Sequence, residues 1–379
     1  MEIWKALFKW QWSPLVGGVL IGFVNTMMFA YDSPWAVYSG LRNWGLHVLE
    51  YIPGIGDVAQ ISPLEHKSSV MDIAFFLGAF AAALLAKEFA VRIPPLREAV
   101  KGIIGGGLMG VGAKLAGGCT IGGFYSSIAA LSASGIFMML GLFVGAVAGI
   151  KILMWEKRVM KSPPTGGKLI AIPHFLQVTL GVVALVAGII AIPYYYDSLD
   201  FNELGVLFSF AMILGITNQR SRFCFVRAIR EPFLTGDGEM TKAAALAFVV
   251  AIIGFTVIKY ADIQDSMVFV AFTAGWPAAL GGLIFGIGMT LAGGCASGSI
   301  WRAGEGHIKL WLAVISFALS AAAAHLLLEL TFNFTYLKRV FLPDVWDSWL
   351  IALAIPLLIM FVWSSIAAWN EKTEKLTLL

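Results

Sequence analysis

The sequence predicts an all-α, polytopic membrane protein made of two halves that carry the same motif. Composition is the first reason: 59% of the 379 residues are hydrophobic and 13% are charged, and the mean hydropathy is +0.83. A soluble domain needs more polar residues than this to cover its surface. Several apolar runs also reach the roughly 20 residues that span a bilayer, and a Gly-rich segment occurs twice.

The repeated segment begins at Gly105 and again at Gly281. It reads GGGLMGVGAKLAGGCTIG in the first copy and GGLIFGIGMTLAGGCASG in the second, with ten of eighteen positions identical at an offset of 176. Each copy is an apolar run that stops at Gly-Gly-Cys and then restarts. A repeat of this length within one chain indicates two structural halves.

Apolar segments follow one another along both halves. In the first half they cover 13–31, an amphipathic run at 35–50, 69–91, 102–133 with the first motif, and 135–155. In the second half they cover 174–193, ending at Pro193, then 203–218, 241–261, 277–301 with the second motif, 309–331 and 348–369. Together they predict about nine full spans, with short broken or re-entrant helices at the motifs.

Two basic loops set the expected topology. Lysines and arginines gather at 92–101 and at 151–168, and such loops stay on the cytoplasmic side. The motif segments then cross in opposite directions, which predicts an inverted repeat whose half-helix ends meet near the midplane. If 35–50 or the motif segments turn back instead of crossing, the N-terminus moves to the outside.

This pattern divides the chain into three parts. We expect a first membrane repeat over 1–160, a linker loop with a connecting span over 161–202, and a second membrane repeat with a C-terminal span over 203–379. The linker begins where Pro163-Pro164 interrupts the apolar pattern, as prolines commonly do between helices. The aromatic run Tyr194–Tyr196 after the connecting span is typical of a membrane interface.

The glycines of the motifs fall into two groups with different expected roles. Gly117-Gly118 and Gly293-Gly294 should break the helix and free the N–H groups at the start of the next one, which forms an anion site. The upstream glycines are spaced as in close-packed membrane helices, and we expect them only to allow tight packing. They are Gly106, Gly110, Gly282 and Gly286.

Three cysteines, Cys119, Cys224 and Cys295, lie far apart in apolar surroundings. Their odd number and long spacing argue against a disulfide scaffold or a zinc knuckle. Because two of them stand in the duplicated breaks, we interpret them as functional. Thiols can bind a sulfur-containing anion through S–H hydrogen bonds and sulfur contacts. Thiolates favoured by nearby cations can instead form transient persulfides.

Cations stand near these cysteines. Arg220, Arg222 and Arg227 flank Cys224, and Lys114 precedes Cys119 within an apolar helix. A buried charge in a membrane helix is a candidate functional group, but Lys114 could also simply snorkel or pair with Asp72 or Glu98. The later arginines, Arg227 and Arg230, fit an ordinary positive-inside turn. The segment 301–307 is read either as a mouth of the pathway or as a helix end with an Arg302–Glu305 pair.

Three stretches resemble the YeeE/YedE family of bacterial inner-membrane proteins: LAGGCTIGG at 115–123, NQRSRFC at 218–224, and the segment 281–307 with WRAGEGH at its end. The resemblance implies an hourglass-shaped helical transporter with short helices dipping from both faces. It implies uptake of thiosulfate or, in the YedE branch, a role with selenium or related sulfur compounds. A small soluble sulfur carrier of the TusA type is the implied partner.

The family's central cysteines correspond by motif to Cys119, Cys224 and Cys295. A further cysteine in the first helix of some thiosulfate-transporting members has no counterpart within residues 13–50. We expect a multi-pass protein of the bacterial inner membrane that moves a sulfur-containing anion, thiosulfate, inward. The expected path is lined by the following residues: Cys119, Cys224, Cys295, Lys114, Gly117, Gly118, Gly293, Gly294, Arg220 and Arg222.

Other functions are compatible with the same residues. The protein could transport a selenium compound, or it could be a membrane sulfurtransferase that forms a persulfide and feeds the soluble carrier. A scaffold for that carrier is a third alternative. We expect no enzymatic reaction, cofactor, catalytic residue or metal, and no nucleotide-driven step, because the chain lacks a GxxxxGK[ST] motif. We also expect no nucleic-acid partner.

Overall fold

The computed structural model describes residues 10–54, 56–160, 166–197, 202–271, 273–331 and 339–378. It confirms a mostly helical fold, and nine helices among these residues are long and apolar enough to cross a membrane. Parts of the predicted linker, 161–165 and 198–201, lie outside the described residues. The all-α expectation needs one correction, because strands β1 (Ala90–Ile93) and β2 (Lys168–Ala171) pair antiparallel.

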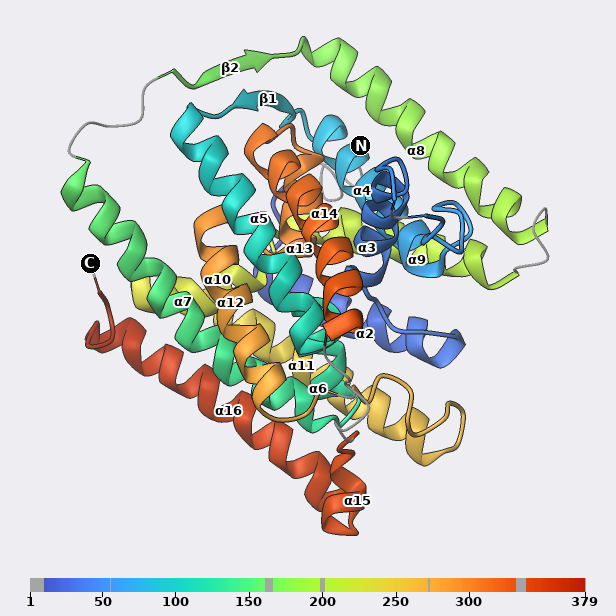
Figure 1. Cartoon of the computed structure of the whole chain (residues 1–379), viewed down its shortest axis with the longest axis vertical. Helices are drawn as coiled ribbons and strands as arrows, with labels where there is room; N and C mark the ends of the chain where they lie inside the picture. The colour runs from blue at the N-terminus through green and yellow to red at the C-terminus, as the bar shows by residue number, and fades with distance from the viewer. Residues whose placement is uncertain are drawn as a thin grey trace.

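The two strands belong to the two basic loops, which sequence patterns could not pair because 75 positions separate Ile93 from its partner Lys168. The sheet marks one end of the molecule (Figure 1). Helices α4 (Lys67–Leu85) and α7 (Ala133–Val159) end there, and helices α5 (Leu96–Ala116) and α8 (His174–Asp197) begin there. We call it the sheet end. The opposite end is formed by the described residues of 32–37, 50–66 and 261–275, and we call it the loop end.

Helices before the second strand are mostly long and apolar. They are α2 (Pro14–Tyr31), α3 (Tyr38–Leu49), α4 (Lys67–Leu85), α5 (Leu96–Ala116), the π-helix η2 (Thr120–Ser126), α6 (Ser127–Ala129) and α7 (Ala133–Val159). The amphipathic run expected at 35–50 is thus helix α3. The first motif is a long helix followed by the short pair η2–α6, as the predicted break requires.

The helices after β2 begin with α8, which passes through Pro193 and ends four residues later; the predicted end at Pro193 was wrong. A proline in a last turn removes one hydrogen bond without stopping the helix. The helices are α8 (His174–Asp197), α9 (Asn202–Ser221), α10 (Phe225–Leu234), α11 (Glu239–Tyr260), α12 (Trp276–Ala292), α13 (Ala296–Ala303), α14 (Ile308–Thr331), α15 (Leu342–Trp346) and α16 (Trp349–Thr373).

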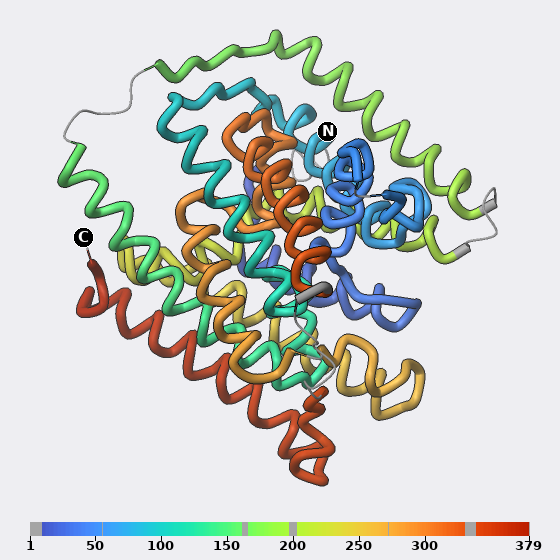
Figure 2. The backbone as a smooth tube through the Cα atoms, viewed as in Figure 1, coloured from blue at the N-terminus to red at the C-terminus, as the bar shows by residue number. Residues whose placement is uncertain are grey.

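The long helices of the two motifs lie at the centre of the bundle. Helix α12 packs against α5 and α7, and α5 also packs against α14. Around them, α2 packs with α11 and α4 with α9. Helix α8 runs along one edge of the molecule and α16 along the opposite edge, as the tube in Figure 2 shows.

The upstream motif glycines pack helix against helix, which confirms their interpretation as packing residues. A side chain on Gly106 would collide with the carbonyl oxygen of Ala313, and one on Gly282 with that of Met138. Gly110 lies equally close to Phe317. Such contacts bring helix backbones together and stabilise the bundle by dispersion and close packing.

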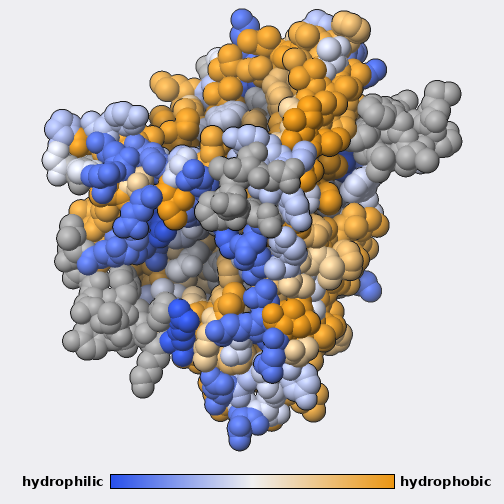
Figure 3. All heavy atoms as spheres, turned by 90° about the vertical axis from the view of Figure 1, so that its right-hand side faces the viewer, coloured by the Kyte–Doolittle hydropathy of each residue, from blue (hydrophilic) through white to orange (hydrophobic). Residues whose placement is uncertain are grey.

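Polar residues gather at the loop end. Figure 3 views that side of the molecule, where hydrophilic residues lie across the middle and hydrophobic residues cover much of the surface around them. Lys67 there donates to Asp32 (2.8 Å) and to Glu203 (2.5 Å), which ties α4 to α2 and α9. The apolar surface on the flanks is what a membrane protein presents to lipid.

Candidate functional site

The two motif copies break the helix in the same way. Helix α5 ends at Gly117 (φ 78°, ψ 14°) and α12 ends at Gly293 (φ 82°, ψ 14°), both in the left-handed region that favours glycine. The chain then becomes extended at Cys119 (φ −82°, ψ −171°) and at Cys295 (φ −77°, ψ −175°) before the next helix starts. The predicted breaks are confirmed, and both copies fold alike.

The second position of each pair requires glycine for a different reason. A side chain on Gly118 would lie 2.5 Å from the backbone nitrogen of Gly123, and one on Gly294 would lie 2.8 Å from the hydroxyl of Ser299. Neither glycine has a positive φ. Gly118 and Gly294 therefore let the new short helix fold back closely onto the break.

Each thiol caps the short helix that follows it. The Ile121 N–H donates to Cys119 Sγ (3.4 Å), and the Gly298 N–H donates to Cys295 Sγ (3.4 Å). Both cysteines are fully buried. An N-cap side chain normally offers oxygen to these free N–H groups; here sulfur takes its place, so the sulfur atoms lie at the positive ends of the short helices.

The structure brings the three cysteines into one region. A methyl group on Gly298 would lie 3.0 Å from Cys224 Sγ and 3.2 Å from Cys295 Sγ, so both thiols face the same glycine. The Thr120 hydroxyl, next in the chain to Cys119, borders the Cys295 thiol. Residues 119, 224 and 295 therefore form what we call the cysteine cluster, which no sequence spacing predicts.

Buried hydroxyl groups at the breaks have unused hydrogen-bonding capacity. The Ser299 hydroxyl oxygen is buried and has no hydrogen-bond partner among the described residues, and the buried Thr120 hydroxyl has only the Cys295 thiol beside it. An unsatisfied buried hydroxyl costs stability. These groups are consistent with a site that receives a polar ligand, and we had not singled them out in the sequence.

The two arginines expected on the path lie at the sheet end and are ion-paired. Arg222, itself in a left-handed conformation (φ 55°), binds Glu88 Oε2 (2.7 Å) and Glu305 Oε1 (2.5 Å). Arg220 is buried and donates to Glu88 (3.3 Å) and to the Trp10 carbonyl (2.9 Å). Burial raises the pKa of Glu305. We call Glu88, Arg220, Arg222 and Glu305 the arginine cluster.

Two ion pairs that the sequence left open as alternatives do not form as named. Lys114 does pair with a carboxylate, but its partner is Glu329 (3.0 Å), with His325 Nδ1 at 2.9 Å, rather than Asp72 or Glu98. These residues lie on α14, one helix over, and could not be found without the packing of α5 against α14.

Arg302 does not pair with Glu305 either, because its guanidinium donates to the carbonyl of Gly293 (2.9 Å) at the break. That carbonyl is left free where α12 ends, so Arg302 caps the helix. Arg227 lies 3.8 Å from Asp237 and Arg230 lies 2.7 Å from Glu231. Both arginines are thus engaged outside the cysteine cluster.

A pocket at the loop end reaches the first break. It has a volume of about 460 Å³, and its lining includes Tyr38, Ser39, Gly117, Gly118, Phe269 and Arg339. We call it the loop-end pocket. Because Cys119 below it has no exposed surface, the pocket stops short of the cysteine cluster in this conformation.

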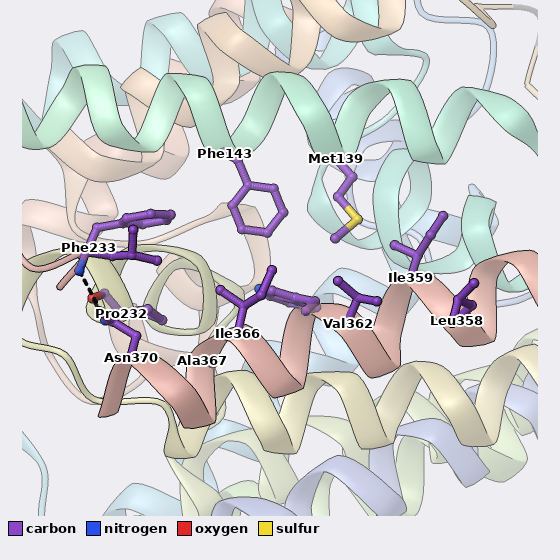
Figure 4. Close-up of a pocket in the computed structure, with 12 residues that line it drawn as sticks. Met139, Phe143, Pro232, Phe233, Leu358, Ile359, Val362, Ile366, Ala367 and Asn370 are labelled. Atoms are coloured by element: carbon purple, nitrogen blue, oxygen red, sulfur yellow. Dashed lines mark hydrogen bonds between the residues drawn. The ribbon is translucent and has the colours of Figure 1, made fainter. Parts of the chain in front are cut away.

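Another pocket, of about 420 Å³, lies between α7, α10 and α16 and is shown in Figure 4. Its lining is almost entirely apolar, with residues such as Phe143, Phe233 and Trp363. The Asn370 side chain at one end donates to the carbonyl of Pro232 (2.7 Å). An apolar lining cannot hold an anion, so the candidate site is the cysteine cluster instead.

The sequence did not predict that Glu88 and Glu305 belong to the arginine cluster. Their signal was present but weak: Glu88 follows a span directly, and Glu305 lies in the polar segment 301–307. Within the described ranges, no three His, Cys, Asp or Glu side chains gather in a way that could hold a metal ion.

Comparison with known proteins agrees with this architecture. Residues 1–148 and 220–378 match the model of a family described as sulphur transport. The chain is 28% identical over 318 residues to the probable transporter YedE of Escherichia coli, covering 79% of this chain and 77% of that protein. YedE of Salmonella typhimurium matches equally well.

A shorter match connects the chain with a thiosulfate transporter. It is 36% identical over 114 residues to the thiosulfate transporter TsuA of Escherichia coli, covering 29% of this chain and 31% of TsuA. TsuA of Spirochaeta thermophila is 35% identical over 119 residues. Because the family model covers most of the sequence, this chain belongs to the sulphur transport family of membrane transporters.

Proposed function

We propose that this protein carries thiosulfate inward across the cytoplasmic membrane of a bacterium, past Cys119, Cys295 and Cys224. The main support is the cysteine cluster: two helix breaks with the same backbone conformation carry Cys119 and Cys295 at the starts of η2 and α13, and Cys224 at the start of α10 faces Gly298 together with Cys295. Thiosulfate offers a terminal sulfur to these thiols and oxygen atoms to nearby donors. The similarity to TsuA, although it covers under a third of the chain, supports this choice of anion.

The groups around the cluster suit a dianion. The first turns of η2 and α13 present N–H groups and the positive ends of helix dipoles. The buried hydroxyls of Thr120 and Ser299 add two donors. Thiols donate weakly and contact sulfur favourably. The anion is thus held by many weak contacts, which allows it to leave again.

The two halves, 1–160 and 203–379, are proposed to form an inverted repeat. The glycine contacts between α5 and α12 support this: a side chain on Gly105 would lie 2.6 Å from the Gly288 carbonyl oxygen, and one on Gly281 would lie 2.6 Å from that of Gly112. The repeat pairs 105 with 281 and 112 with 288, so exchanging the halves turns one contact into the other. A two-fold axis between the helices has this property.

The sheet end is proposed to face the cytoplasm, because the two basic loops lie there. The anion would then enter the loop-end pocket, where Arg339 lines the wall. It would pass the cysteine cluster and leave beside the arginine cluster. At the exit it would compete with Glu88 and Glu305 for Arg222. Lys114, bound to Glu329, would act only as a fixed charge near the entrance.

Uptake of ³⁵S-thiosulfate by cells that depend on this protein tests the proposal. We expect Cys119→Ala, Cys224→Ala and Cys295→Ala each to reduce initial uptake at least tenfold. Ser364→Ala on α16 is the control, since this half-buried serine donates to the Phe361 carbonyl of its own helix, far from the cysteine cluster in the chain. Wild-type uptake in both Cys119→Ala and Cys295→Ala would refute the cysteine path.

The alternatives predict other results. A selenium-compound transporter would carry selenite in the same assay and leave thiosulfate outside. A sulfurtransferase would add one sulfur atom to a cysteine, which intact-mass measurement after exposure to thiosulfate detects. We expect no such mass change. A soluble sulfur carrier of the TusA type remains the proposed cytoplasmic partner, and it would dock at the sheet end.

A further inference from the structure

One acidic side chain inside the bundle has no charged partner among the residues that the structure describes. Asp72 lies on α4, in its second turn from the loop end, and has no exposed surface. The backbone N–H of Leu41 is the donor nearest to its carboxyl group, but neither oxygen makes a well-formed hydrogen bond among the described residues, and no described cation pairs with it. An ionised carboxylate buried without a partner is strongly unfavourable, whereas the protonated form is not. The site therefore favours a neutral carboxyl group.

Asp72 lies between the outside and the cysteine cluster. Its Oδ2 touches Gly40 on α3, where a side chain would collide with it. The neighbouring Ser39, with Ser68 and Met71 of α4, lines a second loop-end pocket of about 570 Å³ that also contains His66. On its other side, Asp72 is close enough to Cys119 for a carboxylate to repel a thiolate there. Asp72 thus lies directly behind residues that line this pocket.

The charged groups around this end of α4 do not neutralise Asp72. Helix α3 contributes Tyr38 and Arg42, whose guanidinium lies 5.7 Å from the Tyr38 ring centroid. Helix α9 contributes Glu203, which is bound by Lys67. Helix α8 contributes Tyr195, stacked on Phe208 of α9, and Gly304, which follows α13, meets α4 at Phe80, about two turns away. His66, which caps α4, hydrogen-bonds Ser39 (3.4 Å).

We propose that Asp72 is the proton-binding site that couples anion uptake to the proton gradient. The inference rests on the proposed function. A dianion moving inward works against an inside-negative membrane potential, and each proton that travels with it cancels one negative charge. Asp72 takes up a proton from hydronium on the loop-end side, so that one O–H bond of the hydronium breaks as one forms on the carboxyl group. As the anion leaves, the carboxyl O–H bond breaks and water on the sheet-end side takes the proton.

The first test uses purified protein in liposomes and ³⁵S-thiosulfate. The outside solution is made one pH unit more acidic than the inside, which is a tenfold ratio of proton activity. For each proton that travels with the anion, wild type should then accumulate up to about tenfold more thiosulfate than it does at equal pH. Asp72→Asn should still exchange internal for external thiosulfate but show no response to the gradient. Glu203→Gln is the matched control and should respond as wild type. An unchanged response in Asp72→Asn overturns the proposal.

A second test does not depend on thiosulfate. Infrared spectroscopy detects the carbonyl band of a protonated carboxyl group, and at neutral pH this band should be present in wild type and reduced in Asp72→Asn. An identical band in both proteins overturns the proton site. If wild type carries no thiosulfate at all, the proposed function fails, and the infrared comparison alone decides about Asp72. Equal melting temperatures of both proteins show that the variant is folded.

Discussion

At the scale of single residues, the arginine cluster depends on charges that the fold has removed from water. Glu305 is almost fully buried and is held by Arg222 and by Gln219 (3.0 Å). Arg92 donates to its backbone carbonyl (2.7 Å), which fixes the segment between α13 and α14. His307 lies in the same segment, with Nε2 at 3.8 Å from the Glu305 carboxylate. Changes in its protonation should therefore affect the fold there.

His307 should make the protein less stable in acid. Burial, followed by the charges of Arg302, Arg92 and Arg222, lowers its pKa to about 3. As the pH falls below about 6.5, the unfolded chain binds a proton that the folded protein does not, so stability is present above that pH and is lost towards pH 3. When the pH is lowered from 7.5 to 5, the melting temperature of His307→Gln should therefore fall by less than that of wild type.

Thermal unfolding in detergent at the two pH values measures this effect. His174→Gln, a change of the same kind at an exposed position, serves as the control and should melt like the wild type at each pH. If His307→Gln and wild type lose the same melting temperature on acidification, protonation of His307 has no part in the acid response.

At the scale of elements, the space around the first motif helix, α5, differs from one residue to the next. Gly106 faces α14, where a side chain would strike the carbonyl of Ala313. Gly107, the next residue, points elsewhere: a side chain there would meet only the Ser316 hydroxyl, at an ordinary 3.5 Å. Adjacent glycines in one sequence run thus have opposite tolerance for a methyl group.

The pair Gly106→Ala and Gly107→Ala tests this fit. Gly106→Ala should destabilise the protein by about 1–3 kcal/mol, because the helices must separate. Gly107→Ala should be neutral or stabilise it by up to about 1 kcal/mol through helix propensity. Thermal unfolding of the two variants in the same detergent measures both. Equal melting temperatures would show that α5 and α14 can move apart without cost.

The sequence predicted the elements well and their neighbours poorly. The helix breaks at Gly117 and Gly293 were predictable because a left-handed residue before a helix start leaves a local signature. The positions of Glu329 beside Lys114 and of Cys224 beside Cys295 were not, because both contacts join segments far apart in the chain. The β1–β2 pair was missed for the same reason.

At the scale of the whole molecule, the proposed orientation places the two ends on different sides of the membrane. Ser62 lies exposed in the loop-end segment, and Lys372 lies exposed near the end of α16. The three native cysteines are buried, so they should not react with a bulky, membrane-impermeant maleimide. A single added cysteine therefore reports its own side.

Labelling of intact spheroplasts tests the topology. Ser62→Cys should react with the impermeant maleimide from outside, and Lys372→Cys should react only after the membrane is permeabilised. Wild type, with no added cysteine, is the control for background labelling. The opposite pattern would place the sheet end outside and reverse the proposed direction of transport, because the basic loops would then face away from the cytoplasm.

The sulfur caps on η2 and α13 have a kinetic consequence. The backbone N–H groups of Ile121 and Gly298 already donate to Cys119 and Cys295. An anion that binds these N–H groups must therefore displace a cysteine sulfur from them. Release of the anion costs little free energy, because the thiol then accepts the hydrogen bond from the same N–H group again. We therefore expect the anion to stay bound at each site only briefly. Brief binding is what a transport pathway needs, in contrast to a high-affinity binding protein.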